Sequence, residues 1–372
     1  MHPEFPLSPD LIYLNHAAVA PWPLRTALAV SQFAEENARY GASRYLEWVK
    51  QEDLLREQLR DLLNAPSTDD IALVKNTSEA ISLVAFGLDW QPGDNIVSSN
   101  EEFPSNRIPW QALSDRGVEL KEADLNAART PEDALFELAD EHTKLITVSS
   151  VQYASGLRLD MDKIGRFCRD QGILFCIDAI QSLGALRFDV QRCHADFVMA
   201  DGHKWMFGPE GLGVFYTSPR ARGLLGLMQY GWHMVENAGD YDNRSWLPAQ
   251  NARRFECGSP NMLGIHALSA SLSLISETGI ERIETLLLER TAYLVETIMN
   301  HPALELLSSS VSERRSGIVL FRHRSLENQR LYQHLNQNSV VCALRGGGIR
   351  FSPHFYTPLD ALERAVDIVL RA

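Results

Sequence analysis

The chain has 372 residues and an ordinary globular composition, with 45% hydrophobic and 22% charged residues. At roughly 150 residues per domain, this length predicts two domains. The formal net charge of −13 argues against sequence-independent binding to nucleic acid or to an anionic membrane. No apolar run reaches the ~18 residues of a membrane span, and MHPEFPLSPDLIYL at the start lacks the pattern of a secretory signal. The five cysteines form no C-x-x-C pair, so we expect a reduced, cytoplasmic protein without a metal site.

Strand-like and helical segments alternate through the first two-thirds of the chain. The expected strands are DIALV (70–74), DNIVSS (94–99), KLITVSSV (144–151), ILFCIDAI (173–180), ADFVMA (195–200) and GLGVFY (211–216). The expected helices between them include EAISLVAFGL (79–88) and DKIGRFCRDQG (162–172). Continuous apolar strands alternating with helices predict an α/β fold, with a mostly parallel sheet covered on both faces.

The pattern changes from about residue 265. Two long helical segments are followed by short strands near GIVLFRH and GGGIRFSPH, and LDALERAVDIVL reads as a last helix. These segments predict a second, smaller α+β module. We expect a large domain over 16–278 and a small domain made of 1–15 and 279–372.

In such sheets, ligands bind beyond the carboxyl ends of the strands, and three of these ends carry reactive side chains. Thr77 and Ser78 precede a helix expected to begin near Glu79, where they serve either as simple caps or as part of an anion site. Asp178 ends an apolar strand, where a carboxylate is costly to bury without a partner. It either bonds within the turn or pairs with a cationic group of a ligand.

Lys204 lies between two apolar runs, directly after His203 and before Trp205. It either extends to the surface or is a partly desolvated amine that loses its proton and becomes a nucleophile. On an extended backbone, its two neighbours point away from it. Pyridoxal phosphate needs a lysine for its aldehyde, a phosphate cradle and an acid for its ring nitrogen. All three have candidates at the predicted strand ends.

These residues belong to segments that resemble the class V aminotransferase family of fold type I pyridoxal-phosphate enzymes. The resemblance extends from YLNHAAVAP (13–21) to GIRFSPHFYT (348–357), and ADGHKWMFGPEGLGVFY is similar to the lysine segment of that family. Asp178 precedes Lys204 by 26 residues (204 − 178), as in the family. The resemblance implies a large domain with a mostly parallel seven-stranded sheet and a smaller α+β C-terminal domain. It also implies pyridoxal 5'-phosphate as cofactor and a homodimer with shared active sites.

The resemblance also implies a role for each matching residue. Lys204 would be the catalytic lysine that bonds to the cofactor, Asp178 would pair with the ring nitrogen, and Gln181 with the ring's phenolic oxygen. The phosphate would be bound by Thr77, Ser78 and His203, and by Ser259 of the neighbouring subunit; Phe103 would stack on the ring, and Arg350 would bind the substrate carboxylate. Read singly, Phe103 is more typical of a core and Arg350 of a strand surface. His16 is either a satisfied turn residue or a substrate-binding one.

The sequence departs from cysteine desulfurases of that family at three places. Their nucleophilic cysteine lies on a loop before the arginine, whereas Cys342 lies in an apolar VVCAL run, where we expect it to be buried and unreactive. Ser150 replaces a family asparagine, so that either Gln152 supplies the amide or Gln181 acts alone. Asp201 replaces a small hydroxyl residue at the phosphate, and we expect it to turn away or to bond to the backbone.

These features predict an enzyme that removes the Cα hydrogen of an amino acid, with Lys204 as base. Our first expectation is a C–S lyase or desulfurase-like reaction on a sulfur-bearing amino acid, without a persulfide cysteine. An aminotransferase and an amino-acid epimerase are alternatives. A pyridoxal-phosphate-binding protein without catalytic activity is a remote one, because Lys204 and Asp178 are both present.

Overall fold

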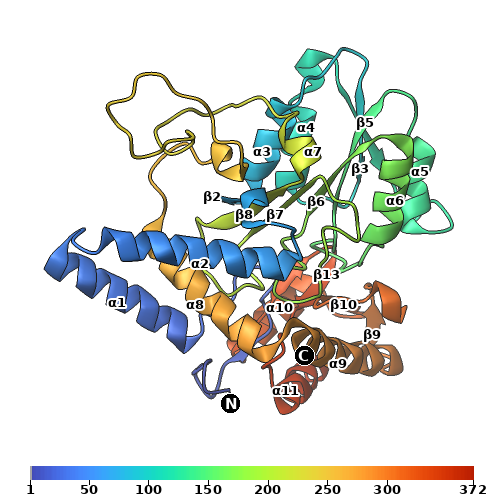
Figure 1. The fold of residues 1–372 in the computed structure, drawn as a ribbon. Coiled ribbons are helices and arrows are strands. Elements are labelled where there is room, and N and C mark those ends of the chain that lie inside the picture. The colour runs from blue at the N-terminus through green and yellow to red at the C-terminus, as the bar shows by residue number, and fades with distance from the viewer. Residues whose placement is uncertain (1) are drawn as a thin grey trace.

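The fold described here is that of a computed structural model, which describes residues 2–372. Its centre is a seven-stranded sheet in the order β2-β8-β7-β6-β5-β3-β4 (Figure 1). The strands are β2 (Ile71–Val74), β3 (Asn95–Ser99), β4 (Glu119–Ala123), β5 (Thr143–Ser149), β6 (Leu174–Asp178), β7 (Phe197–Asp201) and β8 (Gly213–Thr217). Only β8 runs antiparallel to its neighbours. The predicted mostly parallel sheet is therefore confirmed.

Helices cover both faces of this sheet. They are α3 (Thr77–Gly87), α4 (Ile108–Gln111), α5 (Pro131–Leu138), α6 (Met161–Gln171) and α7 (Pro219–Arg222). Alternate residues of one strand enter different cores: Phe175 and Ile177 pack in one buried cluster, whereas Cys176 packs in the other. Burial on both faces explains why the strands are continuously apolar in the sequence.

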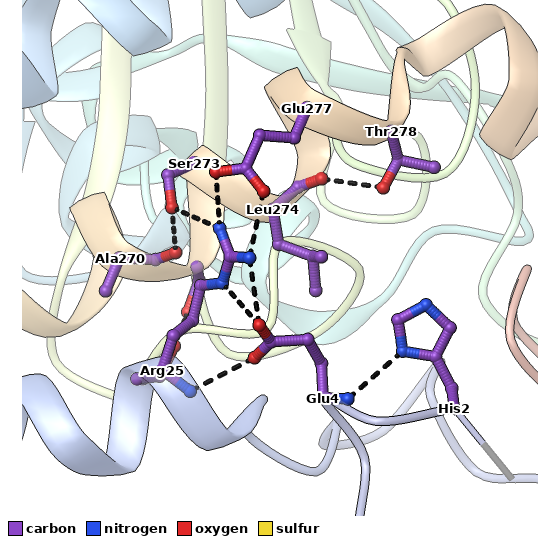
Figure 2. A network of polar contacts seen from close by, with 10 residues as sticks. His2, Glu4, Arg25, Ala270, Ser273, Leu274, Glu277 and Thr278 are labelled. Atoms are coloured by element: carbon purple, nitrogen blue, oxygen red, sulfur yellow. Dashed lines mark hydrogen bonds and ion pairs between the residues drawn. The ribbon is translucent and has the colours of Figure 1, made fainter.

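Two further helices, α1 (Leu24–Tyr40) and α2 (Tyr45–Leu63), precede the sheet and were not among the expected elements. Both pack against α8 (Met262–Thr278), as Figure 1 shows. Figure 2 shows how Arg25 of α1 connects the start of the chain to α8. Its guanidinium donates to Glu4 at 2.9 Å and to Glu277 at 2.8 and 2.9 Å.

The C-terminal module begins where Gly279, with φ 83°, ends α8 and α9 (Ile280–Asn300) follows. Its four-stranded antiparallel sheet has the order β12-β13-β10-β9. The elements are β9 (Leu304–Leu306), β10 (Val319–His323), α10 (Asn328–Gln337), β11 (Val340–Val341), β12 (Ala343–Arg345), β13 (Gly348–Phe351) and α11 (Leu359–Leu370). β1 (Ile12–Tyr13) pairs with β11, so the start of the chain lies against this module.

Short 3₁₀ turns complete the fold: η1 (Thr68–Asp70), η2 (Pro104–Asn106), η3 (Ser114–Arg116), η4 (Ala252–Phe255) and η5 (Ser312–Arg314). Between residues 2 and 372, no helix combines the length and the apolar character needed to cross a membrane.

One predicted helix start is wrong by two residues. α3 begins at Thr77, and its cap is Asn76, whose Oδ1 accepts from the backbone N–H of Glu79 at 2.9 Å. Thr77 and Ser78 are therefore the first helical residues and not its caps. An asparagine caps as well as serine or threonine does, which leaves both hydroxyl residues free for other contacts.

Candidate active site

Three strand ends meet at one edge of the large sheet. Asp178 ends β6, and Asp201 ends the adjacent β7, three residues before Lys204. Thr77, which follows β2, accepts a hydrogen bond through its Oγ1 from the backbone N–H of Asp201 at 3.1 Å. This bond joins the start of α3 to the end of β7, so the predicted convergence of the three ends is present.

The segment that carries Lys204 is a turn, and the expected extended strand end is wrong. β7 stops at Asp201, and the chain reverses toward the antiparallel β8 through bonds such as Phe207 N–H to the carbonyl of Lys204 at 3.0 Å. Trp205 is buried, and its Nε1–H donates to Oε1 of Gln181 at 2.7 Å. The connection to β8 covers residues 202–212 and contains Gly202, Gly208, Pro209 and Gly211, which are residues typical of turns.

Lys204 and Asp178 are two buried groups of opposite charge in the same site. The Lys204 Nζ lies 5.7 Å from the centre of the Phe103 ring. Burial lowers the pKa of Lys204 to about 8, although the carboxylate of Asp178 opposes that shift. Burial likewise raises the pKa of Asp178 to about 7, against the N–H of Ile180 and the charge of Lys204. An amine in this setting is a far better nucleophile at neutral pH than an exposed lysine.

The start of α3 forms the wall expected to hold a phosphate. The first backbone N–H groups of a helix have no partner within it, and they favour an anion. Thr77 is buried here, whereas Ser78 is exposed and its hydroxyl bonds to that of Ser105 at 2.8 Å. Nδ1 of His203 lies 3.1 Å from Oδ1 of Asp201, and neither buried atom has a well-aligned hydrogen bond. Asp201 thus faces His203 instead of turning to the backbone.

Arg350 reaches the site from β13 of the C-terminal module. It is 2% exposed, and its Nη1 donates to the carbonyl of Tyr153 at 2.6 Å, while its buried Nε has no partner. Burial and the charge of Arg345 lower its pKa to about 10. The Tyr153 ring contacts Phe103 edge to face at 5.1 Å. Arg350 is therefore held beside the aromatic wall that also faces Lys204.

Gln181 and Gln152 differ in how much hydrogen-bonding capacity they keep. Gln181 donates to the carbonyl of Ala17 at 3.1 Å, which leaves one N–H of its amide for another acceptor. The amide of Gln152 donates to Glu102 at 2.8 Å and to Ser99 at 3.3 Å, which uses both N–H groups. Ser150 bonds to Ser182 at 2.6 Å. This arrangement favours Gln181 acting alone.

The structure places two further predicted site residues, His16 and Ser259, in different surroundings. His16 is fully buried, with Nδ1 2.8 Å from the carbonyl of Ser352 and Nε2 2.8 Å from the hydroxyl of Tyr356. Burial lowers its pKa to about 4, and the use of both nitrogens favours the packing alternative. Ser259 is exposed on the segment before α8, so a phosphate contact to a neighbouring subunit stays a prediction.

Glu102 is a site residue that sequence reasoning missed. Its buried carboxylate accepts hydrogen bonds from five donors: Ser99 Oγ, Asn106 Nδ2, Ser149 N, Ser149 Oγ and Gln152 Nε2, at 2.5–2.9 Å. It precedes Phe103 directly, and Ser149 is the neighbour of Asp178 in the sheet register. Glu102 thus fixes the loop that carries the ring. The sequence carried one signal for Glu102, because it is an acidic residue soon after the buried strand β3.

Two other polar regions are less suited to chemistry. A cleft of about 740 Å³ lies beyond Ser150 and Ser182, but Lys204 does not line it, and arginines such as Arg158 and Arg314 in its wall are paired with carboxylates. Elsewhere Glu52, His233 and Glu256 form the one metal-like cluster of residues 2–372. The guanidinium of Arg56 bonds to both carboxylates, so their charge is already neutralised.

The residues at the sheet edge fit pyridoxal phosphate. A lysine with a lowered pKa, a buried carboxylate and the start of a helix lie at this edge, and the lysine faces an aromatic ring. Pyridoxal phosphate requires groups of these kinds. The fold and the site together define a fold type I pyridoxal-phosphate enzyme. The model of the family described as aminotransferase class-V matches residues 12–355. The chain belongs to this family, and it is a pyridoxal-phosphate-dependent enzyme that acts on an amino acid.

Similar proteins agree with this assignment. A probable cysteine desulfurase of Methanothermobacter thermautotrophicus is 31% identical over 97% of this chain and 94% of its own length. The structure of the cysteine desulfurase CsdA from Escherichia coli is 25% identical, with a TM-score of 0.86 over 99% of this chain and 97% of that one.

A third similar protein, C-DES, has the same fold at lower identity. One of its structures has glycine covalently linked to the pyridoxal-phosphate cofactor; it is 21% identical, with a TM-score of 0.91 over 98% of each chain. Another is described as the cystine C–S lyase in complex with cysteine persulfide; it is 22% identical, with a TM-score of 0.90 over 98% of this chain and 99% of that one.

Proposed function

We propose that this enzyme cleaves the C–S bond of a sulfur-bearing amino acid and that it forms no persulfide on a cysteine of its own. The observation that carries the second half of the proposal is the environment of Cys342. It is 3% exposed, and burial raises its pKa to about 12. A thiol that accepts sulfur must be an accessible thiolate near neutral pH, which Cys342 is not.

The other cysteines do not supply such a thiol at Lys204. Cys168, Cys176 and Cys193 are buried in the hydrophobic clusters, and burial raises the pKa of each. Cys257 is half-buried before α8, where its Sγ lies 3.2 Å from Oε1 of Gln229. Sulfur would then leave as part of the product instead of on the protein.

We assign the residue roles from the family to which the chain belongs, and the geometry of the site supports them. Bound pyridoxal phosphate withdraws electrons from the substrate Cα, which weakens the bonds at that carbon. Lys204, whose amine is partly neutral at pH 7, takes the Cα proton on its Nζ. The carboxylate of Asp178 holds a proton on the ring nitrogen, and Gln181 donates to the phenolic oxygen. Phe103 packs on the ring and keeps water from it.

The remaining contacts orient the two ligands. We assign the phosphate to the start of α3 with Thr77, Ser78 and His203, completed by Ser259 of a neighbouring subunit. Arg350 is proposed to bind the substrate carboxylate, because its buried Nε lacks a partner and a guanidinium suits bidentate recognition. A substrate contact of His16 would require one of its two present hydrogen bonds to break.

The names of the similar proteins support sulfur chemistry. The Methanothermobacter and Escherichia coli proteins are named cysteine desulfurases, and C-DES is described as a cystine C–S lyase. The likeness to C-DES concerns the fold alone. Transamination and epimerisation begin with the same proton transfer to Lys204 and remain the alternatives.

We also propose a homodimer with shared active sites in the cytoplasm. Large apolar side chains are exposed on α1 and α2 and on the segment between α7 and α8, including Leu28, Tyr40, Leu46, Tyr230 and Trp246. A surface of this kind favours association with a second protein surface. All five cysteines are free thiols, which is compatible with a reducing compartment.

The proposed division of the chain places 16–278 in a large domain and 1–15 with 279–372 in a small one. Two features support it. Gly279 separates α8 from α9 with a positive φ, and β1 pairs with β11 of the C-terminal module.

A panel of substrates tests the reaction. The purified enzyme with pyridoxal phosphate is incubated with cysteine, cystine, S-substituted cysteines and ordinary amino acids, and pyruvate, ammonia, keto acids and D-amino acids are measured. We expect pyruvate from at least one sulfur-bearing substrate. If no pyruvate forms, another keto acid would identify the enzyme as an aminotransferase, and a D-amino acid would identify it as an epimerase. Borohydride should attach the cofactor to Lys204, and a Lys204→Ala variant should show neither attachment nor turnover.

Replacement of Cys342 tests whether the chain carries sulfur itself. We expect Cys342→Ala to keep its pyruvate-forming activity within about twofold, because the thiol is buried and protonated. Cys257→Ser is the matched variant for the least buried thiol. A loss of about a hundredfold in either variant, with the protein still folded and coloured, would show that a persulfide is required.

A further inference from the structure

The side-chain amide of Gln181 is held on two sides. Gln181 is 2% exposed; its Oε1 accepts from the indole Nε1–H of Trp205 at 2.7 Å, and its Nε2 donates to the carbonyl of Ala17 at 3.1 Å. An indole N–H can only donate and a carbonyl can only accept, so these two bonds fix which end of the amide carries the oxygen. The amide nitrogen keeps one N–H, which the proposed function assigns to the phenolic oxygen of the cofactor.

The indole of Trp205 connects this amide to the C-terminal module. Trp205 is 1% exposed, and it packs in a small buried cluster that includes Leu287 of α9 and Ile318. A Cβ on Gly317 would overlap the six-membered part of the indole, so glycine at this position leaves the space that the ring occupies. The position of the ring therefore depends on the C-terminal module as well as on the large sheet.

The backbone of Trp205 is fixed from another direction. Its carbonyl oxygen lies 3.3 Å from Nε2 of His354. A Cβ on Gly184, which has a φ of 91°, would overlap that carbonyl. Because both the backbone and the ring are confined, the indole N–H has one place relative to Gln181.

We propose that Trp205 is a positioning residue for the cofactor: its indole N–H keeps the Gln181 amide turned so that the remaining N–H faces the phenolic oxygen. This inference rests on the proposed role of Gln181 and adds the residue on which that role depends. A hydrogen bond donated to the phenolic oxygen stabilises its anionic form. Without the indole N–H, the buried Oε1 of Gln181 would lack a donor, and the amide would rotate and donate less well to the cofactor.

The visible absorbance of the bound cofactor tests the proposal. It changes with pH when the imine that joins the cofactor to Lys204 loses its proton, which is shared with the phenolic oxygen. Weaker donation from Gln181 leaves more negative charge on that oxygen, so the imine holds its proton to higher pH. We expect Trp205→Phe to raise the midpoint of the absorbance change by about 0.5–1 pH unit.

Trp90→Phe is the matched control for the loss of an indole N–H. The buried indole of Trp90 donates to the carbonyl of Ala85 at 2.6 Å, near the opposite end of α3 from Thr77. Its replacement removes the same group from a buried hydrogen bond, and it should leave the midpoint unchanged. A midpoint in Trp205→Phe equal to that of the wild type would overturn the proposal.

A double variant shows whether the effect of Trp205 passes through Gln181. Gln181→Ala alone should raise the midpoint at least as much as Trp205→Phe, and the double variant should shift no further than Gln181→Ala. Additive shifts would mean that Trp205 acts on the cofactor by another route, which overturns the proposal. An unchanged midpoint in Gln181→Ala would also overturn it.

Gly317→Ala is a second variant that keeps every polar group of the site. The added methyl group requires the indole to move, so the midpoint should again rise although Gly317 lies in the C-terminal module. Gly223→Ala is its control, because a Cβ there would meet no atom within 4 Å. A folded, coloured Gly317→Ala with an unchanged midpoint would contradict the proposal. None of these titrations depends on which substrate bond the enzyme breaks, so the C–S lyase assignment and this proposal can fail separately.

Discussion

Burial shifts the pKa values of Lys204 and Asp178 in opposite directions, and both shifts favour the uncharged form of the side chain. The pKa of Lys204 falls to about 8, and that of Asp178 rises to about 7. An unperturbed lysine has a pKa of about 10.4, so the neutral amine is far more abundant here at pH 7. The sequence indicated both residues, but their pKa values depend on atoms brought together by the fold.

The first prediction concerns pH. The cofactor-free protein should take up pyridoxal phosphate faster as pH rises, with the midpoint of the rise near pH 8, because only the neutral amine of Lys204 reacts with an aldehyde. Absorbance changes after mixing measure this rate. In Asp178→Asn the midpoint should move to lower pH, since the carboxylate no longer stabilises the ammonium. A wild-type midpoint near pH 10, the value of an exposed lysine, would contradict the prediction.

Glu102 gives the second prediction at this scale. Glu102→Gln should lower the free energy of unfolding by about 2–4 kcal/mol, because the new amide turns N–H groups toward donors that need an acceptor. Urea unfolding of the cofactor-free protein measures the change. Glu137→Gln, at an exposed position of α5, is the control and should cost little. Equal effects of the two substitutions would argue against the role of Glu102.

At the scale of elements, apolar runs predicted six of the seven strands of the large sheet, because burial on both faces requires these strands to be continuously apolar. The edge strand β4 was missed because most of its residues are not buried. The turn at Lys204 was not predictable in the same way. It depends on the antiparallel return into β8 and on the burial of Trp205 against Gln181. The helices α1 and α2 were missed because many of their apolar residues are exposed, so that the apolar pattern does not mark one buried face.

Arg56 connects α2 to the segment before α8 and gives the third prediction. Its guanidinium bonds to Glu52 at 2.5 Å, to Glu256 at 2.6 and 2.8 Å, and to the carbonyl of Ile71 at 3.0 Å. Arg56→Met would leave two buried carboxylates without a cation and should cost about 3–5 kcal/mol of stability. Thermal and urea unfolding measure it. Arg60→Met on the same helix, where the ion pair is exposed, should cost at most about 1 kcal/mol.

At the scale of the molecule, the question is whether one chain makes a complete site. Arg350 of the C-terminal module donates to the carbonyl of Tyr153 in the large module, so the two modules meet there. Ser259 is exposed, and so are several large apolar side chains of α1 and α2. Both features are accounted for if a second copy covers this surface and supplies its Ser259.

The fourth prediction follows from that surface. Wild-type protein should sediment as a dimer, and Leu46→Glu, at a side chain that is 77% exposed on α2, should shift the equilibrium toward monomer. Cofactor affinity should fall along with dimerisation. Val311→Glu is the control, since Val311 is 53% exposed in the C-terminal module. A monomeric wild type that binds the cofactor tightly would contradict the shared site.

The sequence by itself predicted most strands of the sheet and the family, and it singled out Lys204 and Asp178, because these depend on local apolar patterns and on a short motif with a fixed spacing. Only the tertiary structure decided what surrounds them. Glu102 became the centre of a hydrogen-bond network with Gln152, and His16 was enclosed by Ser352 and Tyr356. These relations join segments far apart in the chain, and their register and burial are set only when the segments pack together.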